Sequence, residues 1–484
     1  MLFNSIEYLL FLPIVFICYW LLRNKLQIQN GLLLVASYFF YGLWDYRFLS
    51  LIIISSLADY SIALAIKKSD KKLNKKLLLF GSLAVNLGFL LVFKYYNFFL
   101  SSFVDLAQTM GFEASYSSLK IILPVGISFY TFQTLSYTID VYRGKMEPTR
   151  NMLNFFTYVA FFPQLVAGPI ERASNLLPQI ELKRTFSNKK AIDGMRQILW
   201  GLFKKVAIAD NCAVFVDSIF SSYGELGGGV LILGAVLFAF QIYCDFSGYS
   251  DIAIGTARLL GFNLMQNFAT PYFARDIAEF WRRWHISLST WFRDYVYIPL
   301  GGSRVGRWLQ LRNVFAIFLI SGFWHGANWT FIFWGLIHSL FYIPQVLSGS
   351  NRAYLDYVAA GKFVPSVLDI FRMARTFVIV TVAWVFFRSD SMMDSFQYLK
   401  RVFSSSDDGF FNELKEMGLD TSILNYIAIY VLIMLTFEWS NRMGQHGLWK
   451  LPKNIFLRYI IYIVLCLLVL EYFYGQRSFI YFQF

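Results

Sequence analysis

Three of the four histidines in this 484-residue chain, His285, His325 and His338, lie in or just before one apolar stretch, Val314–Leu347. His325 follows Arg312 by 13 residues, and on a helix that rises 1.5 Å per residue this places it about 20 Å along the axis. That depth is past the midplane of a hydrocarbon core about 30 Å thick. An ionisable side chain there is costly unless it lines a cavity or has a partner, so His325 is predicted to be functional. The alternative is a neutral imidazole that donates a hydrogen bond between helices.

The neighbours of His325 suit acid–base chemistry on a hydroxyl group. Imidazole can take a proton from a hydroxyl near neutral pH, and such catalysis typically contributes about 10²–10⁴-fold to a rate. If the helix continues, Ser321 and Asn328 share a face with His325, because they stand at i−4 and i+3. Gly326 would let a substrate approach the backbone closely. The sequence contains neither GxSxG nor HExxH, so it indicates no serine triad, and we expect no bound metal.

Two carboxylates flank a polar run, CDFSGYSD, that follows the apolar segment Gly229–Asp245. Asp245 and Asp251 enclose three hydroxyl-bearing residues in this run. Carboxylates within a membrane protein line pores or support catalysis, because an ionisable group is costly in lipid. The alternative interpretation is a polar helix terminus.

Arginine and tryptophan alternate between Gly248 and Arg312, where the sequence becomes amphipathic. Aromatic rings and long basic side chains favour the headgroup layer of a membrane, where each is half buried. Ile277–Tyr297 is therefore predicted to form a helix or helices at the cytoplasmic interface, with a pure membrane anchor as the alternative. Arg282 and Arg283 could meet the phosphates of a donor substrate electrostatically, although an anchoring role explains them equally well.

The elements that position these residues are predicted to be membrane-spanning helices. The chain is 57% hydrophobic and only 15% charged, whereas soluble domains carry about 25% charged residues. Apolar runs recur along the whole chain, which indicates an all-α, multi-pass integral membrane protein with about eleven crossings. The predicted spans are Ile6–Leu22, Gly31–Trp44, Phe48–Ile66, Leu77–Leu100, Leu119–Val141, Gly229–Asp245, Val314–Leu347 (too long for one crossing), Val367–Phe387, Ile423–Trp439 and Phe456–Tyr474.

Two further segments are harder to assign. Met195–Ile219 is apolar, but Lys204 and Lys205 interrupt it. Leu153–Ala167 is short, contains proline and has basic loops on both sides. This combination predicts a re-entrant or interfacial segment.

The formal net charge of +13 would suggest nucleic-acid binding in a soluble protein. In a membrane protein, however, Lys and Arg accumulate in cytoplasmic loops and set the orientation. Basic residues follow the first, third and fifth predicted spans, and this alternation is consistent if the N-terminus lies outside the cytoplasm. We therefore expect membrane lipids, and no nucleic acid, around this chain.

Five motifs together resemble the membrane-bound O-acyltransferase family, in particular its bacterial alginate O-acetylation branch and, more distantly, the D-alanine transferase of teichoic acids. The motifs are PVGISFYTFQTLSYTIDVYRG (Pro124–Gly144), FFPQLVAGPIER (Phe161–Arg172), YCDFSGYSDIAIG (Tyr243–Gly255), FWRRWHISLSTWFRDYVYIPLGG (Phe280–Gly302) and SGFWHGANWTFIFWGLIH (Ser321–His338). They occur in the family's order. The resemblance implies that residues 1–350 form the catalytic membrane core, with a central tunnel, and that residues 351–484 add helices that complete the bundle.

The resemblance also implies roles for individual residues. His325 matches the family's invariant histidine, and His285, 40 residues earlier, matches its second position. His338 matches a less constrained histidine of the bacterial branch. His325 would act as general base or position the acceptor, and His285 would orient the thioester or share the proton transfer. Ser321, Asn328, Asp245 and Asp251 are the supporting candidates, and Arg282 and Arg283 are the candidates for donor binding.

The reaction implied by the resemblance is transfer of an acetyl group from a cytosolic thioester, acetyl-CoA, toward hydroxyls of an exported polysaccharide such as alginate. No tightly bound cofactor is expected. The implied location is the bacterial cytoplasmic (inner) membrane, and the implied partner is an extracytoplasmic acetyltransferase of hydrolase fold. Two alternatives stay open: D-alanyl transfer to teichoic acid, and a transporter for a polymer precursor in which His325 relays protons.

Overall fold

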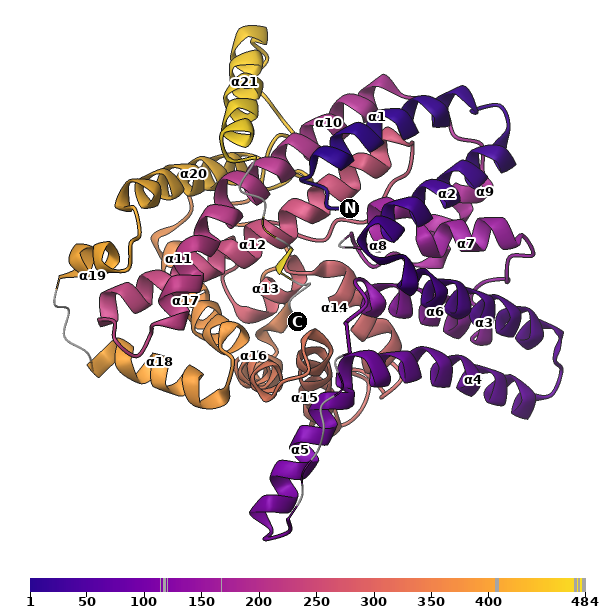
Figure 1. Cartoon of the computed structure of the whole chain (residues 1–484), viewed down its shortest axis with the longest axis horizontal. Coiled ribbons are helices and arrows are strands. Elements are labelled where there is room, and N and C mark those ends of the chain that lie inside the picture. Colours follow the sequence, from indigo (N-terminus) through magenta and orange to yellow (C-terminus); the bar gives the residue numbers. More distant parts are fainter. Residues whose placement is uncertain are drawn as a thin grey trace. The chain divides into compact units, whose positions relative to one another are not determined.

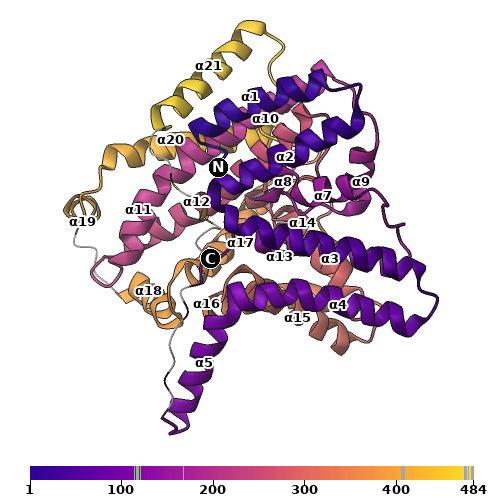
Figure 2. The same cartoon turned by 45° about the vertical axis from the view of Figure 1, so that its right-hand side comes forward.

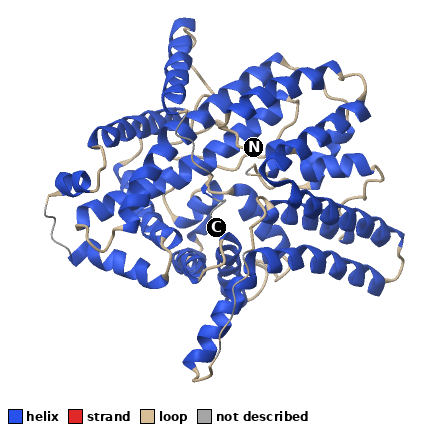
Figure 3. Cartoon of the chain, viewed as in Figure 1, coloured by secondary structure: helices blue, strands red, loops and turns tan. Residues whose placement is uncertain are grey.

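The computed structural model describes residues 1–113, 115, 119, 121–166, 168–404, 409–473, 477 and 479–480. Within these residues every regular element is a helix (Figure 3), as the composition predicts. In the part of the chain that the structure describes, seven helical stretches are long and apolar enough to cross a membrane: Leu26–Lys68, Lys72–Thr109, Gly228–Leu259, Trp329–Leu347, Val367–Arg388, Thr421–Ser440 and Ile455–Tyr472. The chain is thus a multi-pass helical membrane protein.

The described chain divides into two compact units. The first comprises Met1–Ala191 and Ala257–Met265, and the second comprises Ile192–Thr256 and Gln266–Phe484. Residue 350, the predicted end of the catalytic core, lies within the second unit.

The helices of the first unit are α1 (Ile6–Leu21), α2 (Leu26–Asp45), α3 (Leu49–Lys68), α4 (Lys72–Leu90), α5 (Tyr96–Thr109), α6 (Ile127–Tyr142), α7 (Met152–Ala160), α8 (Phe162–Leu165) and α9 (Ala173–Glu181), with a short 3-10 turn at Tyr46–Phe48 and a π-helical turn at Leu91–Tyr95. α3 runs beside α4 in both views (Figures 1 and 2) and also packs on α6. The carboxylate of Asp59 on α3 joins these helices. It accepts hydrogen bonds from Asn86 Nδ2 of α4 (2.7 Å), Thr138 Oγ1 of α6 (3.0 Å) and the Ser82 hydroxyl.

The predicted span Leu119–Val141 is wrong at its start, because α6 begins only at Ile127. Pro124 disfavours a helical conformation for the residue before it. Gly126 then takes a left-handed conformation (φ 75°) and forms the helix N-cap. The predicted re-entrant segment consists of α7 and α8, two short buried helices separated by Phe161. Its predicted last residue, Ala167, lies outside the described residues, as does Tyr474 at the end of the last predicted span.

The second unit contains α10 (Asn188–Leu202), α11 (Asp210–Ser221), α12 (Gly228–Leu259), α13 (Ile277–Arg283), α14 (Ile286–Phe292), α15 (Arg307–His325), α16 (Trp329–Leu347), α17 (Val367–Arg388), α18 (Met392–Ser404), α19 (Phe410–Glu416), α20 (Thr421–Ser440) and α21 (Ile455–Tyr472), with 3-10 turns at Pro271–Phe273 and Ser350–Arg352. The first residues of α10 and the last of α12 extend into the first unit. α15 and α16 pack closely against each other, and α17 packs on α16.

The segment of uncertain assignment, Met195–Ile219, is one continuous helical run. α10 continues through a π-helical stretch, Phe203–Ala209, directly into α11. The backbones of α10 and α12 touch at glycines: a Cβ added to Gly201 would lie 2.5 Å from the Gly248 carbonyl oxygen, and one on Gly255 would lie 2.5 Å from that of Gly194. Small residues allow such close helix contacts in membranes.

Candidate active site

Two helix ends bring His285 and His325 together. α15 ends at His325, and the chain then becomes extended at Gly326 (φ −156°, ψ 152°) before α16 begins. His285 lies between α13 and α14 and occupies the N-cap of α14 in a left-handed conformation (φ 43°, ψ 54°). The two imidazole centroids are 6.3 Å apart. The left-handed region is strained for a residue with a side chain, and such residues concentrate at functional sites.

Aromatic rings surround His325, which is almost fully buried. Its ring makes edge contacts with Trp334 of α16 and Phe387 of α17, at centroid distances of 5.1 and 5.5 Å. The ring of Trp324 is 4.9 Å away. Electrostatic interactions are stronger in such a low-dielectric setting than in water. Nearby charges and dipoles would therefore strongly affect the free energy of proton transfer to His325.

His338 belongs to the same aromatic cluster but is not adjacent to His325. The Trp334 ring stands next to both histidines, 5.1 Å from His325 and 4.8 Å from His338. The indole Nε1–H of Trp281 donates a hydrogen bond to Nδ1 of His338 (3.2 Å). His338 is therefore held by the wall of the site as a neutral acceptor at Nδ1.

The prediction that Asn328 shares a helical face with His325 is wrong, because the helix ends at His325. Asn328 instead caps α16: its side-chain oxygen accepts a hydrogen bond from the Thr330 N–H (3.1 Å), and its Nδ2 donates to the Asp390 carbonyl (2.8 Å). An asparagine at an N-cap satisfies a helix amide that would otherwise lack a partner. Ser321 does lie one turn before His325 on α15.

A cavity of about 740 Å³ lies in the second unit, within the size range of small-molecule sites. Its walls combine apolar rings with hydroxyl, amide and guanidinium groups. Residues from α13–α16 and the chain after α16 line it, among them Trp281, Arg282, Ile286, Ser289, Thr290, Arg293, Tyr297, Gln310, Phe318, Ser321, Tyr342 and Arg352. Trp281 and Phe318, which line the cavity, also contact the His338 ring.

The two arginines predicted to bind a donor have different environments. Arg282 lines the cavity, and its guanidinium donates to the Asn351 and Tyr354 carbonyls (2.8 and 2.7 Å). Arg283 is buried and pairs with Glu279 of the same helix at 2.7 Å. Arg283 therefore holds α13 together, and only Arg282 of this pair borders the cavity.

The tryptophans of the amphipathic interval are not positioned as lipid anchors. Trp281, Trp284 and Trp291 are all buried in the protein, so the headgroup interpretation is wrong for these three. Trp284, for example, packs on Trp384 of α17 at 5.1 Å. Trp308, at 84% exposure, is the exception. Arginine–tryptophan alternation alone cannot separate a membrane surface from a core, since both residue types combine apolar and polar parts.

Asp245 and Asp251 lie inside α12, so the interpretation as a polar helix terminus is wrong. Each carboxylate meets one of the two lysines that interrupt the apolar run. Lys204 Nζ is 2.7 Å from Asp251, and Lys205 Nζ is 2.8 Å from Asp245. These four side chains are buried, and buried charges are retained only when they are paired.

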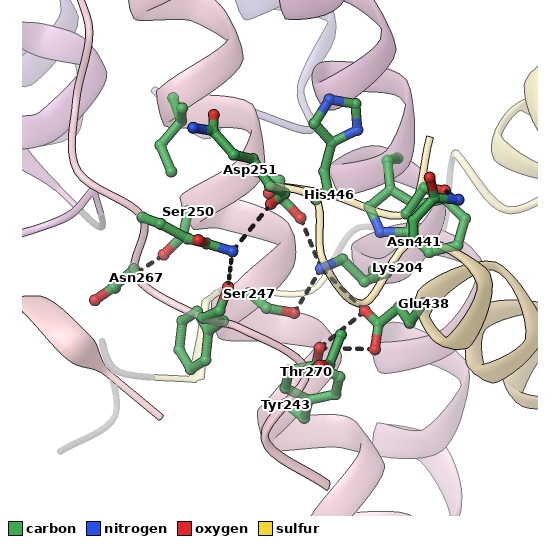
Figure 4. A pocket seen from close by; sticks show the side chains of 17 residues that line it. Lys204, Tyr243, Ser247, Ser250, Asp251, Asn267, Thr270, Glu438, Asn441 and His446 are labelled. Atoms are coloured by element: carbon green, nitrogen blue, oxygen red, sulfur yellow. Dashed lines mark hydrogen bonds and ion pairs between the residues drawn. The ribbon is translucent and has the colours of Figure 1, made fainter. Parts of the chain in front are cut away.

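Figure 4 shows Lys204 and Asp251, one of these two ion pairs, at a small pocket. Lys204 Nζ donates to Ser247 Oγ (2.8 Å) and approaches Glu438 of α20 at 3.9 Å. The Tyr243 hydroxyl donates to Glu438 (2.8 Å). Glu438 was not predicted to belong to this site. The pocket has room for about one water molecule, with a volume near 20 Å³.

Asn267, which sequence reasoning missed, connects this pocket to His285. Its Nδ2 donates to Ser250 Oγ (3.1 Å), and its Oδ1 is 3.1 Å from His285 Nδ1. Burial lowers the pKa of His285 to about 3, so the imidazole is neutral near pH 7. In the described part of the chain, no group of three or more His, Cys, Asp or Glu side chains could hold a metal ion.

Comparison with known proteins gives consistent matches. The model of MBOAT, the membrane-bound O-acyltransferase family, matches residues 40–372, a range that holds every histidine discussed above. A probable alginate O-acetylase, AlgI, of Pseudomonas aeruginosa is 40% identical over 456 residues, which cover 94% of this chain and 84% of that protein.

Two further relatives differ in the group or the polymer that their names specify. A peptidoglycan O-acetyltransferase of Helicobacter pylori is 37% identical over 431 residues (83% of this chain, 79% of that protein). A teichoic acid D-alanyltransferase of Bacillus subtilis is 26% identical over 234 residues (46% of this chain, 58% of that protein). These matches show that the chain is an O-acyltransferase and belongs to the membrane-bound O-acyltransferase family.

Proposed function

We propose that this protein transfers an acetyl group from a cytosolic thioester, acetyl-CoA, toward hydroxyl groups of an exported polysaccharide such as alginate. The observation that carries the proposal is the pair His285 and His325, whose rings are 6.3 Å apart inside an aromatic cluster. The names of the relatives support acetyl as the group and a polysaccharide as the acceptor. The match to AlgI covers 94% of the chain, against 46% for the D-alanyltransferase, which favours acetyl over D-alanyl.

The cavity of about 740 Å³ is the proposed donor site. Its apolar rings would bury the acyl arm of a thioester, and Arg282 and other arginines on its wall would attract donor phosphates. Arg282 already donates to two carbonyls, which fixes the orientation of its guanidinium. Ser321 lines the cavity one turn before His325. This supports a donor site close to the proposed base.

In the proposed reaction, His325 acts as general base. The acceptor hydroxyl oxygen attacks the thioester carbonyl carbon while its proton moves to the imidazole of His325. The carbon–sulfur bond then breaks, and the thiolate takes that proton and leaves as a thiol. A positioned imidazole contributes about 10²–10⁴-fold to such a step. His338 and Trp281 would support the wall behind this base, and Asp245 and Asp251 would support it indirectly by holding α12 to α10 and its continuation.

The remaining features are proposed on the same basis. The chain would reside in the bacterial inner membrane, with its N-terminus outside the cytoplasm, because basic loops favour the cytoplasmic side. About eleven crossings would surround a tunnel that joins the two compartments. The acetyl group would leave on the outer side, through an extracytoplasmic partner acetyltransferase of hydrolase fold.

Reconstituted protein tests the donor and the group in one experiment. Proteoliposomes that contain the purified chain are given labelled acetyl-CoA, or in parallel a D-alanyl carrier-protein thioester, and thiol release is measured. We expect release from acetyl-CoA, with the acetyl mass appearing on added polysaccharide when the partner is present. Release from the D-alanyl thioester alone would overturn the proposed group, and release from neither would overturn the proposed activity.

A further inference from the structure

Asn267 is fully buried and contacts the loop that carries His285 in four ways. Its main-chain oxygen accepts a hydrogen bond from the Ile286 N–H (2.9 Å). Its Oδ1 receives the Ser287 hydroxyl (2.9 Å) and the Ser287 N–H (3.3 Å), and lies 3.1 Å from His285 Nδ1. Neither Asn267, His285 nor Ser287 has any exposed surface. Asn267 therefore holds the loop that carries His285 in place.

The orientation of the Asn267 amide is fixed by a group that can only donate. The Ser287 main-chain N–H has no lone pair, so the atom that faces it must be the amide oxygen. On its other side, Asn267 Nδ2 donates to Ser250 Oγ (3.1 Å). A flipped amide would place N–H against N–H at Ser287, whereas the Ser250 hydroxyl can pair with either end of the amide.

The oxygen that faces His285 then fixes the position of the imidazole proton. A carboxamide oxygen can only accept, so Nδ1 must carry the proton. The Ser287 hydroxyl is 3.5 Å from Nδ1, but it lies closer to Asn267 Oδ1 and donates there. If that hydroxyl donated to Nδ1 instead, two lone pairs would face each other across 3.1 Å. Since the second ring nitrogen of a neutral imidazole is an acceptor, Nε2 of His285 is a lone-pair acceptor.

We propose that Asn267 is a positioning residue that holds His285 in the Nδ1–H form, so that His285 meets the reactants as a hydrogen-bond acceptor at Nε2. Nε2 has no hydrogen-bond partner within the described part of the chain, and the atom is buried. The inference rests on the proposed acyl transfer, and it separates two roles for His285. An acceptor can bind the proton of an incoming hydroxyl, whereas it cannot donate to the thioester oxygen.

The distance to His325 fits this role. Rings with centroids 6.3 Å apart are too far apart for a direct hydrogen bond between ring nitrogens. One oxygen atom, from an acceptor hydroxyl or a water, can lie between them. Because the attacking hydroxyl has one proton and gives it to His325, His285 Nε2 would hold the substrate through a bridging water or a second substrate hydroxyl, and the Nδ1–H···Oδ1 bond would strengthen Nε2 as an acceptor.

The tautomer can be measured without any activity. Protein labelled with ¹⁵N-histidine gives nitrogen signals from only four residues, and protonated and bare ring nitrogens differ in chemical shift. In solid-state spectra of the protein in lipid, the signals lost in His285→Gln identify His285. We expect a protonated Nδ1 and a bare Nε2. A protonated Nε2 with a bare Nδ1 would overturn the inference, even if the wild-type protein transfers acetyl groups.

Kinetics of three variants distinguish positioning from folding. Asn267→Ala is expected to lower kcat by about 10- to 100-fold, the loss that corresponds to one buried hydrogen bond, with the KM for the thioester changed by less than about twofold. Asn267→Asp keeps an acceptor for Nδ1–H and should recover most of the rate. Asn313→Ala is the matched control, because Asn313 is an equally buried amide that bonds the Leu300 and Gly302 carbonyls.

Asn313→Ala should retain the Nδ1–H signal of His285 and most of kcat. Equal losses in Asn267→Ala and Asn267→Asp would contradict the role of the acceptor oxygen. Absence of thiol release in the wild-type protein would instead refute the proposed activity, and the tautomer measurement would still decide the arrangement of Asn267 and His285.

Discussion

The buried ion pairs of Lys204 with Asp251 and Glu438 allow the free energy of unfolding lost on substitution of Lys204 to be predicted. Lys204 is buried and lies 2.7 Å from Asp251 and 3.9 Å from Glu438. Substitution of Lys204 by Met would leave two buried carboxylates without their cation. Removal of one partner from a buried ion pair typically lowers the free energy of unfolding by about 3–5 kcal/mol. We expect a loss of that order for Lys204→Met.

An exposed pair of the same type provides the control. Lys67 and Glu147 are 2.6 Å apart, but both side chains are more than half exposed. Exposed pairs contribute about 0–1 kcal/mol, so Lys67→Met should be close to wild type. The double variant Lys204→Met/Asp251→Leu removes both members of the buried pair and should be more stable than Lys204→Met alone.

Equilibrium unfolding in mixed detergent, followed by tryptophan fluorescence, measures these differences. Size-exclusion chromatography before each titration confirms that the variants start from a folded monodisperse state. If Lys204→Met were as stable as Lys67→Met, the assignment of a buried charge network to α10–α12 and α20 would be refuted. If the double variant were less stable than the single one, the carboxylate would not be the cause of the loss.

Three further predictions concern pH, packing and the cavity. Burial raises the pKa of Glu171 from 4.5 to about 7, so between these pH values the native state retains a proton that the unfolded state releases. The free energy of unfolding should therefore fall as the pH rises from 4.5 to about 7. Glu171→Gln should remove this pH dependence in thermal unfolding, and an unchanged pH dependence would contradict the prediction. A Cβ on Gly322 would overlap the Phe331 carbonyl oxygen, so Gly322→Val should push α15 away from α16. We expect the free energy of unfolding to fall by about 1–3 kcal/mol or more and acetyl transfer to slow. Thermal stability equal to that of the wild type would refute the close contact. Arg282→Ala should raise the KM for acetyl-CoA with little change in stability, whereas Arg283→Ala should mainly lower stability, and the reverse pattern would contradict the cavity assignment.

Local sequence patterns predicted the helical class, and the family resemblance implied which residues form the site. Apolar runs predicted most of the helices, because a chain segment in lipid must hydrogen-bond its own backbone N–H and C=O groups, and a helix does so. Val314–Leu347 is too long for one crossing, and the structure shows that this stretch belongs to two helices, α15 and α16. The family motifs imply that His285 and His325 belong to one site, and the centroids of their rings are 6.3 Å apart.

The features that were missed depend on contacts between distant segments. Lys204 and Glu438 are more than two hundred residues apart in sequence, and neither apolar run reveals that its charge is matched elsewhere. A signal was present, since lysines and carboxylates that each interrupt apolar helices must be paired somewhere. Asn328 was misplaced because the helix end at His325 depends on packing around Gly326 as well as on local propensity. A side chain on Gly326 would overlap the Phe331 ring.

Asn267 lies in a short extended segment of ordinary polarity, so no local pattern distinguishes it. Its importance follows from two main-chain hydrogen bonds that join this segment to the chain around α13 and α14: Ala269 N–H to the Arg283 carbonyl, and Ile286 N–H to the Asn267 carbonyl. Pairing of this kind is a tertiary property. The sequence therefore points to the candidate imidazoles more clearly than to the residues that hold them.

The central claim is that His325 takes the proton during acetyl transfer, and one comparison tests it most directly. Single-turnover transfer from labelled acetyl-CoA is measured for wild-type protein, His325→Ala and His446→Ala. His446 is the matched control, since it is a buried histidine of the same unit whose Nε2 lies 3.2 Å from Asp193. We expect His325→Ala, inserted and folded, to lose at least 100-fold in rate, on the order of what a general base contributes, while His446→Ala retains most of the wild-type rate. Transfer by His325→Ala at a rate close to that of His446→Ala would contradict the claim.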